Sequence, residues 1–188
     1  DSSEYGVPQR RLRNFFVITN GVKAFDFDMV KKDQHIVTVK EAISELYDFD
    51  TAKGEVVLNN VPLTKYQKYL RSENNVVFHD VRYPAEKVQN RISYVPQGGN
   101  WKDVPEELWP TDRKNRHSSA YKRLNENDVS VTIDTGNNHS NYFHPKYNRI
   151  PTVREAARLQ SFPDEFIFLG NRSDQYRQVG NAVPPLLS

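Results

Sequence analysis

The chain has 188 residues, enough for one domain with a hydrophobic core or for a small domain joined to part of another. Its net charge of +2 is below the strongly basic composition of a dedicated DNA-binding domain, and the lack of cysteine excludes disulfides and thiolate chemistry. No apolar run is long enough to span a membrane, and no signal peptide begins the chain. Because the chain begins with Asp1 and stops directly after a Pro-Pro-Leu-Leu run, we expect both ends to be internal to a longer protein.

An arginine-rich segment comes first. If residues 9–13 are extended, Gln9, Arg11 and Arg13 share one face, and Arg10 and Leu12 share the other. Two guanidiniums on one side suit forked hydrogen bonding to a phosphate or to a base carbonyl oxygen. The alternative is a solvated edge that guards the following strand.

Residues 14–19 form a short apolar, β-rich run followed by Asn20-Gly21, which predicts a buried strand ending in a turn. Thr38 and Glu41 then have the spacing of a capping box, and apolar residues follow at helical spacing. The sequence therefore predicts a strand and then a helix before residue 50.

From about 50 to 148 the pattern is short, polar and irregular, and we expect strands only at 56–58, 76–78 and 129–133. Near its end lies a basic cluster that we expect to face DNA phosphates, consisting of Arg113, Lys114, Arg116, Lys122 and Arg123. The stretches 97–101 and 136–141 are rich in amide groups that could read base edges, but either could equally be a surface loop.

Two tryptophans and two histidines in this region are expected to have structural roles. Trp101 and Trp109 are expected to be core or hinge anchors, with stacking on a displaced base as the alternative. His79 and His144 are expected to be ordinary loop residues, because the histidines show no metal-ligand spacing and cysteine is absent. We therefore predict no metal site.

A second capping box, Thr152 with Glu155, predicts a helix that Pro163 stops. Arg154 and Arg158 lie one turn apart, and we interpret this helix as an amphipathic packing helix with solvated ends. Pro184-Pro185 predicts that residues 181–183 are an extended loop leading into a further helix.

Three segments, 5–13, 152–164 and 178–187, resemble in this order the last three sequence blocks of bacterial cytosine-5 DNA methyltransferases. That family places its variable target-recognition region between the first two of these blocks. The resemblance implies an α+β fold: an irregular mixed target-recognition lobe plus the terminal strand and helix segments of an α/β methyltransferase catalytic domain. It predicts catalytic-domain residues at 1–49, the recognition region at 50–148 and a return to the catalytic domain at 149–188.

The resemblance also implies roles for individual residues. Gln9, Arg11 and Arg13 would meet the flipped target cytosine and its flanking phosphates, and Thr132 would lie close to the DNA backbone. Asn181, Ala182 and Val183 would line part of the S-adenosylmethionine pocket. The family's cysteine nucleophile, its Glu-Asn-Val block and its glycine-rich cofactor loop do not occur in this sequence. The chain alone is therefore predicted to be inactive.

Taken together, these features predict the DNA-recognition and cofactor-pocket-closing part of a restriction-modification methyltransferase, active on double-stranded DNA in the bacterial cytoplasm and associated with the nucleoid. The catalytic half would be supplied in cis or in trans. Two alternatives remain: a non-catalytic subunit of a split methyltransferase, and a stand-alone DNA-binding or regulatory module.

Overall fold

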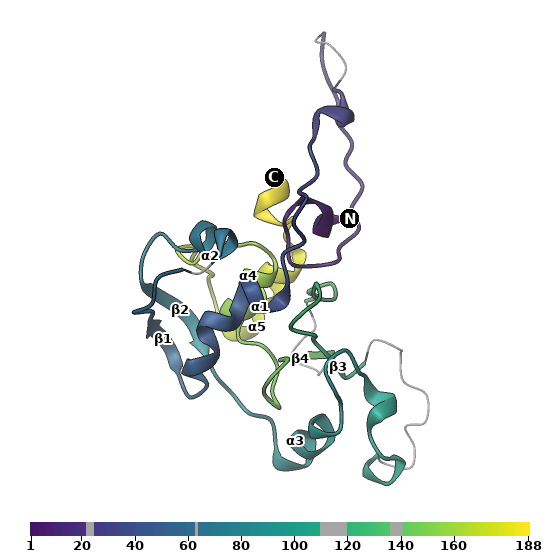
Figure 1. Cartoon of the computed structure of the whole chain (residues 1–188), viewed down its shortest axis with the longest axis vertical. Helices are drawn as coiled ribbons and strands as arrows, with labels where there is room; N and C mark the ends of the chain where they lie inside the picture. Colours follow the sequence, from purple (N-terminus) through teal and green to yellow (C-terminus); the bar gives the residue numbers. More distant parts are fainter. Residues whose placement is uncertain (22–24, 63, 110–119, 136–140) are drawn as a thin grey trace.

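The computed structural model describes residues 1–21, 25–62, 64–109, 120–135 and 141–188. Within these ranges the fold is α+β, as predicted, with short helices and two small sheets (Figure 1). The α-helices are α1 (Val39–Ile43), α2 (Lys65–Leu70), α3 (Glu86–Ser93), α4 (Val153–Leu159) and α5 (Arg172–Asn181). The strands are β1 (Lys53–Val57), β2 (Asn75–Asp80), β3 (Lys122–Arg123) and β4 (Tyr142–Phe143). The 3₁₀ segments are η1 (Ser2–Tyr5), η2 (Phe27–Met29), η3 (Ser44–Phe49), η4 (Trp101–Asp103), η5 (Glu106–Leu108) and η7 (Pro185–Leu187).

Both predicted capping boxes are present. The Thr38 side chain accepts from the Glu41 amide at the start of α1, and Thr152 does the same for Glu155 at the start of α4. In each box the glutamate reaches back to the capping residue's amide, so two unpaired N–H groups of the first turn are satisfied. Helix α4 ends at Leu159, ahead of Pro163 as expected.

The two predicted strands at 56–58 and 76–78 correspond to β1 and β2, which pair antiparallel and are connected through α2. The register changes between Gly54 and Glu55, where a β-bulge lies. Gly54 has φ 110°, a conformation that favours glycine, and Phe78 on β2 also has a positive φ of 66°. Strand β2 of this pair packs on α4.

Helix α4 lies at the centre of the main core. It contacts α1, α5 and β2, and buries Val153, Ala156, Ala157 and Leu159 in one hydrophobic cluster (Figure 1). The same cluster includes residues from each of the three predicted parts of the chain, such as Ile43, Ile133 and Val179. The boundaries at 50 and 148 stay predictions, since packing in the main cluster continues across both.

A smaller hydrophobic cluster lies farther along the chain and consists of Ile92, Tyr121 and Phe143, with both tryptophans packed at its edge. The Trp109 and Tyr121 rings meet edge to face with centroids 4.9 Å apart. The short parallel pair of β3 and β4 joins this cluster to the main core. The expectation that Trp101 and Trp109 are structural anchors agrees with this packing.

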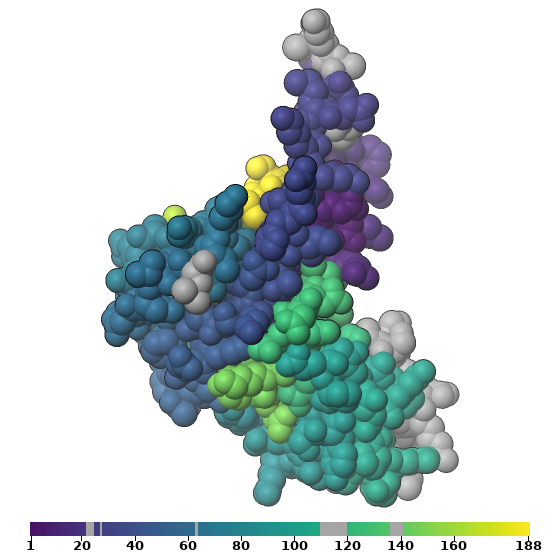
Figure 2. Space-filling model, in the orientation of Figure 1, coloured from purple at the N-terminus to yellow at the C-terminus, as the bar shows by residue number. Residues whose placement is uncertain are grey.

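The predicted strand at 14–19 is wrong. Residues 12–21 and 25–36 form a projecting segment, here called the arm, in which residues 14–19 have no strand partner among the described residues (Figures 1 and 2). Phe16 is 90% exposed and Ile18 is 95% exposed. A strand needs a neighbouring ladder for its backbone groups, and the described part of the chain provides none here.

Two further expectations need correction. In place of a strand at 129–133, the structure has a single bridge between Ser130 and Gln9. Asn181 is the last residue of α5 and only Ala182 and Val183 are extended before the two prolines, because the helix continues to its cap at Ala182. Among the described residues, no helix has both the length and the apolar character needed to cross a bilayer.

Candidate functional site

The arginine block follows the predicted alternation for its first four residues. Gln9 and Arg11 are buried, and Arg10 and Leu12 are exposed. The Gln9 side-chain oxygen accepts from the Ile133 amide at 2.8 Å, and its amide nitrogen donates to the Gln160 side chain. Gln9 therefore connects the block to the segment before residue 135 and to the end of α4.

Arg11 uses both terminal nitrogens on main-chain carbonyls. Nη1 donates to the Ile133 oxygen at 2.9 Å, and Nη2 donates to the oxygens of Gly180 at 2.7 Å and Ala182 at 3.2 Å. Burial, together with the positive charge of Arg13, lowers the pKa of Arg11 to about 10. The structure thus gives Arg11 a bridging position in which its fork is occupied by the protein itself.

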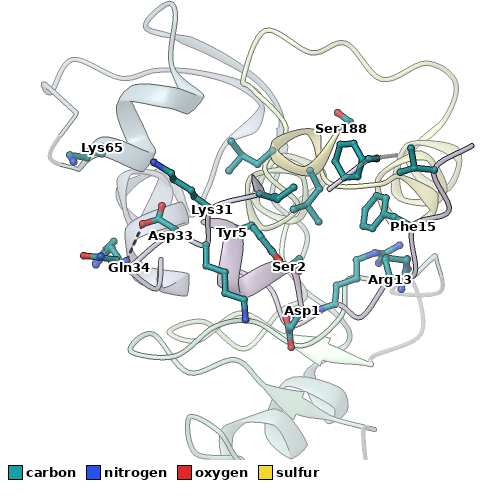
Figure 3. A pocket seen from close by; sticks show the side chains of 18 residues that line it. Asp1, Ser2, Tyr5, Arg13, Phe15, Lys31, Asp33, Gln34, Lys65 and Ser188 are labelled. Atoms are coloured by element: carbon teal, nitrogen blue, oxygen red, sulfur yellow. Dashed lines mark hydrogen bonds between the residues drawn. The ribbon is translucent and has the colours of Figure 1, made fainter. Parts of the chain in front are cut away.

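Arg13 differs from Arg11 because it is exposed. Its Nη1 donates to the Leu12 carbonyl at 2.7 Å, and its side chain lines a groove of about 1010 Å³ between the arm, the N-terminal residues and η7. Figure 3 shows Arg13 and Phe15 on one side of this groove and Lys31 and Asp33 on the other. Of the two arginines predicted to meet the target nucleotide, Arg13 is the accessible one.

The three predicted cofactor residues lie at the end of α5. Asn181 and Val183 are exposed, whereas Ala182 is partly buried and its carbonyl accepts from Arg11 and from Gln160 at 2.8 Å. The backbone is therefore held from the inside while the two neighbouring side chains face outward. This arrangement leaves Asn181 and Val183 available to a ligand.

The prediction of solvated ends for α4 is wrong, since Arg154, Glu155 and Arg158 are fully buried. Arg158 donates to Asp164 at 2.5 and 3.0 Å and to Glu45 at 3.0 Å. Burial disfavours the Arg158 charge, but the two carboxylates outweigh that effect and raise the pKa of Arg158 above its usual value. These partners compensate the charge of a guanidinium that has lost its water.

Arg149 and Glu155 form a second buried ion pair, with two N–O distances of 2.8 and 2.9 Å. Burial raises the pKa of Glu155, but Arg149 and its hydrogen bonds outweigh this and hold that pKa well below its usual range. Arg149 also binds Asp50 at 2.7 Å. The start of α4 is thereby joined to the residues that follow η3.

Arg154 has a different environment. It donates to the carbonyls of Val77, Pro163 and Phe166 at 2.9 to 3.0 Å. Burial lowers the pKa of Arg154 to about 10. All three arginines of this network therefore hold the fold together, and none of the three faces solvent.

The expectation that His79 and His144 are ordinary loop residues is also wrong, because both side chains are completely buried. His79 lies on β2 with Nδ1 3.0 Å from the Thr152 hydroxyl, and His144 Nδ1 accepts from the amides of Lys146 and Tyr147. Burial lowers the pKa of both imidazoles. The capping hydroxyl of Thr152 and the turn after β4 thus each bind a neutral histidine.

The predicted DNA-binding residues have different positions. Arg123 is buried and donates to the carbonyls of Val95 at 2.6 Å and Ile92 at 2.7 Å, a structural role that replaces its predicted phosphate contact. Lys122 is partly buried and its ammonium donates to the Gly98 carbonyl. Thr132 is exposed and its hydroxyl donates to the Arg10 carbonyl at 2.8 Å. Arg113, Lys114 and Arg116 lie outside the described residues, as does most of the 136–141 stretch.

The loop at 97–101 is closely structured. Asn100 caps η4 and its amide donates to Asp103 at 2.7 Å, while Gln97 accepts from the Glu126 amide. A Cβ at Gly99 would lie 2.5 Å from Asp103 and 2.7 Å from Pro96, so that position has room only for glycine. Gly99 and Asn100 therefore have a structural explanation, and base reading by this loop stays a prediction.

Within the described ranges, no three His, Asp or Glu side chains converge in a way that could hold a metal ion.

Arg149, Gln160 and Asp164 supply central contacts of the network, and the sequence does not single them out. The residues next to them in the sequence give little indication of their burial, because similar residues can precede or follow either a buried or a solvated polar side chain. The one usable clue is the apolar setting: Arg154 follows Val153, and Arg158 lies between Ala157 and Leu159. A guanidinium buried among such residues requires carboxylate or carbonyl partners.

Comparison with known proteins identifies the family of the chain. The family model for C-5 cytosine-specific DNA methylases matches residues 1–188. The type II methyltransferase M.DdeI of Desulfomicrobium norvegicum is 31% identical over 100% of this chain and 51% of its own length. M1.HphI of Haemophilus parahaemolyticus is 32% identical over 100% of this chain and 44% of its own, and M.Eco47II of Escherichia coli is 32% identical over 98% and 41%.

A solved structure is similar as well. It is the crystal structure of a candidate DNA modification methyltransferase encoded within an E. coli prophage, with a TM-score of 0.73 and 26% identity over 99% of this chain and 55% of that one. The chain thus spans about half the length of the relatives that it matches. Because the family model covers every residue, the chain belongs to the C-5 cytosine-specific DNA methylase family.

Proposed function

We propose that the chain is the DNA-recognition and cofactor-pocket-closing part of a restriction-modification DNA (cytosine-5)-methyltransferase. Its target would be a cytosine rotated out of double-stranded DNA in the bacterial cytoplasm, in association with the nucleoid. Family membership supports the reaction class, and the lack of cysteine in a chain about half as long as its relatives supports the division of labour.

The observation that carries the proposal is the arm beside the groove. Among the described residues of the arm, eight large apolar side chains are exposed, which is a large apolar surface for so short a segment: Leu12, Phe15, Phe16, Val17, Ile18, Met29, Val30 and Ile36. The adjoining groove is lined by cationic side chains that include Arg13, Lys31 and Lys32. A catalytic half that covers the apolar surface would bring its nucleophile to a groove suited to a polyanion.

The reaction divides accordingly. In the catalytic half, a cysteine thiolate would add to C6 of the flipped cytosine; C5 would then take the methyl group, lose its proton, and the thiolate would leave. Arg13 would neutralise the phosphate or hold the base carbonyl with its planar fork. Thr132, Lys122 and the cluster of Arg113, Lys114 and Arg116 would contact the DNA backbone and fix its register.

The residues at the end of α5 fit one wall of a cofactor site. Asn181 offers a carboxamide donor and acceptor to solvent, and Val183 offers an apolar surface 43% exposed, while the backbone between them is fixed by Arg11 and Gln160. S-adenosylmethionine, when bound, supplies the methyl group. Asn181 and Val183 would orient it and exclude water on this side.

A split-enzyme subunit would have the same surfaces, and the exposed arm favours it over a stand-alone DNA-binding module. A self-sufficient module would cover its apolar residues with its own chain. The distinction between a separate subunit and a fused half lies in the gene, and the flanking reading frame settles it.

Methyl-transfer assays test the proposal. We expect no labelled methyl incorporation into DNA by this chain alone, and incorporation when the preceding half of the protein is supplied in cis or in trans. Incorporation by the isolated chain above a no-protein control would overturn the assigned division of labour. No incorporation by the complete protein would overturn the function itself.

A further inference from the structure

A ring of buried hydrogen bonds connects the Thr132 segment to the cofactor-binding end of α5. Arg11 joins the Ile133 carbonyl to those of Gly180 and Ala182. Gln160 donates to the carbonyls of Val179 at 3.0 Å and Ala182 at 2.8 Å, and accepts from Gln9. The Gln9 side-chain oxygen accepts a hydrogen bond from the Ile133 amide at 2.8 Å, which closes the ring.

The two segments that the ring joins also touch directly. A Cβ on Gly180 would lie 2.5 Å from the Asp134 carbonyl carbon and 2.7 Å from the Thr135 nitrogen. Backbone therefore packs on backbone, with no side chain between them to absorb a displacement. A shift of residues 132–134 must move either Gly180 or the Arg11 guanidinium.

The exposed groups on either side of this contact point to two different ligands. Thr132 is exposed immediately before Ile133, and Asn181 is exposed immediately after Gly180. Under the proposed function, the first group meets the DNA backbone and the second meets the cofactor. Two ligand sites are then separated by one shared buried junction.

We propose that Arg11 is a positioning residue that links DNA binding to cofactor binding, instead of contacting the target nucleotide. A ligand that orders residues 132–134 fixes the Arg11 fork and with it the Gly180 and Ala182 carbonyls. The second ligand then finds its loop already ordered, so each binds more tightly in the presence of the other. This inference rests on the proposed function.

The test uses the complete methyltransferase and S-adenosylhomocysteine as the probe. Its Kd is measured by calorimetry without DNA and with a duplex that carries the methylation site, and the ratio of the two is the coupling factor. We expect a factor above one for the unaltered protein. In Arg11→Lys, which keeps the charge but cannot reach three carbonyls, we expect the factor to fall about tenfold, or to one if the starting factor is smaller. Arg10→Lys, next in sequence but exposed, is the matched control and should keep the factor unchanged.

A second measurement needs no variant and covers the case in which Arg11→Lys does not fold. In the unaltered, DNA-free protein, S-adenosylhomocysteine should slow amide hydrogen exchange at residues 131–134. While methylation persists, any one of three results would overturn the inference. The first is a coupling factor of one in the unaltered protein, and the second is an equal factor in the unaltered protein and in a folded Arg11→Lys variant. The third is unchanged hydrogen exchange at 131–134. If the complete, unaltered protein does not methylate DNA, the proposed function is overturned, and the inference with it.

Discussion

Helix α4 and the arm have opposite relations between residue type and burial. Arg154 and Arg158 are completely buried, while Phe16 and Ile18 of the arm are almost completely exposed. The arginines have carboxylates and carbonyls arranged around them, and the side chains of Phe16 and Ile18 are left almost uncovered by the described part of the chain. This difference indicates that the polarity of a side chain alone does not decide its burial. Burial also depends on whether the partners of that side chain are present in the same chain.

The largest expected effect comes from removing one buried charge. Arg158→Met should lower the free energy of unfolding by about 3 to 5 kcal/mol, because it leaves Asp164 and part of Glu45 buried without their counter-ion. Urea unfolding of the chain measures this. Arg177→Met on the exposed side of α5 breaks a 3.3 Å ion pair with Asp174 and should cost less than about 1 kcal/mol. Equal costs at the two positions would contradict the contrast between buried and exposed charge.

The arm should respond in the opposite way. Phe16→Asp combined with Ile18→Asp should leave the stability of the chain within about 0.5 kcal/mol, because both side chains already face water. Reassembly with the catalytic half should weaken about a hundredfold or more, since burying each large side chain contributes about 1.5 to 3 kcal/mol. Titration of methyl-transfer activity against the catalytic half provides the measurement. Leu169→Asp, at an exposed apolar residue outside the arm, is the control, and unaltered reassembly in the double variant would show that the arm is not the contact.

Arg13 and Arg10 sharpen the comparison at the base of the arm. In the reassembled enzyme Arg13→Lys should slow methylation about ten- to a hundredfold, because it loses a charge-assisted bond of about 1.5 to 3 kcal/mol. Arg10→Lys should have little effect, since Arg10 lies on the opposite face of the segment from Arg11. Single-turnover rates at saturating DNA give the comparison. Similar rates for the two variants would argue against a role for the Arg13 fork.

The smallest effect is a pH dependence of stability. Burial lowers the pKa of His79 and His144 from 6.5 in the folded state, so below about pH 6.5 the unfolded chain binds protons that the folded chain does not. The free energy of unfolding should therefore fall with decreasing pH, by up to about 1.4 kcal/mol per pH unit for each histidine. Urea unfolding at pH 7.5, 6.5 and 5.5 measures this slope. His79→Gln should reduce it, because that variant removes one of the two buried imidazoles.

Local signals predicted local structure well. Features that depend on residues within a few positions of one another are present: the two capping boxes, strands β1 and β2, and the end of α4 before Pro163. The alternation of Gln9, Arg10 and Arg11 held for the same reason. Arg13 departs from it because the chain leaves the body at the start of the arm.

The partners of the buried groups could not be predicted. Arg158 meets Glu45 and Arg11 meets Gly180 across more than a hundred residues of sequence, and only the folded chain brings them together. Arg123 illustrates the consequence: its place in a basic cluster suggested phosphate contact, and its actual partners are the carbonyls of Ile92 and Val95. The strand expected at 14–19 failed because the pattern of an apolar strand contains no information about where its ladder comes from.

The carbonyl contacts of the buried arginines also affect how such a chain can evolve. Arg11, Arg123 and Arg154 grip main-chain oxygens, which every amino acid supplies, so these anchors do not depend on which side chains the anchored segments display. Substitutions at Val77, Ile92 or Ile133 leave the acceptor in place as long as the backbone keeps its path. Under the proposed function, a recognition region attached in this way would be able to exchange the residues that read DNA, and so acquire a new target, while its attachment to the rest of the enzyme stays unchanged.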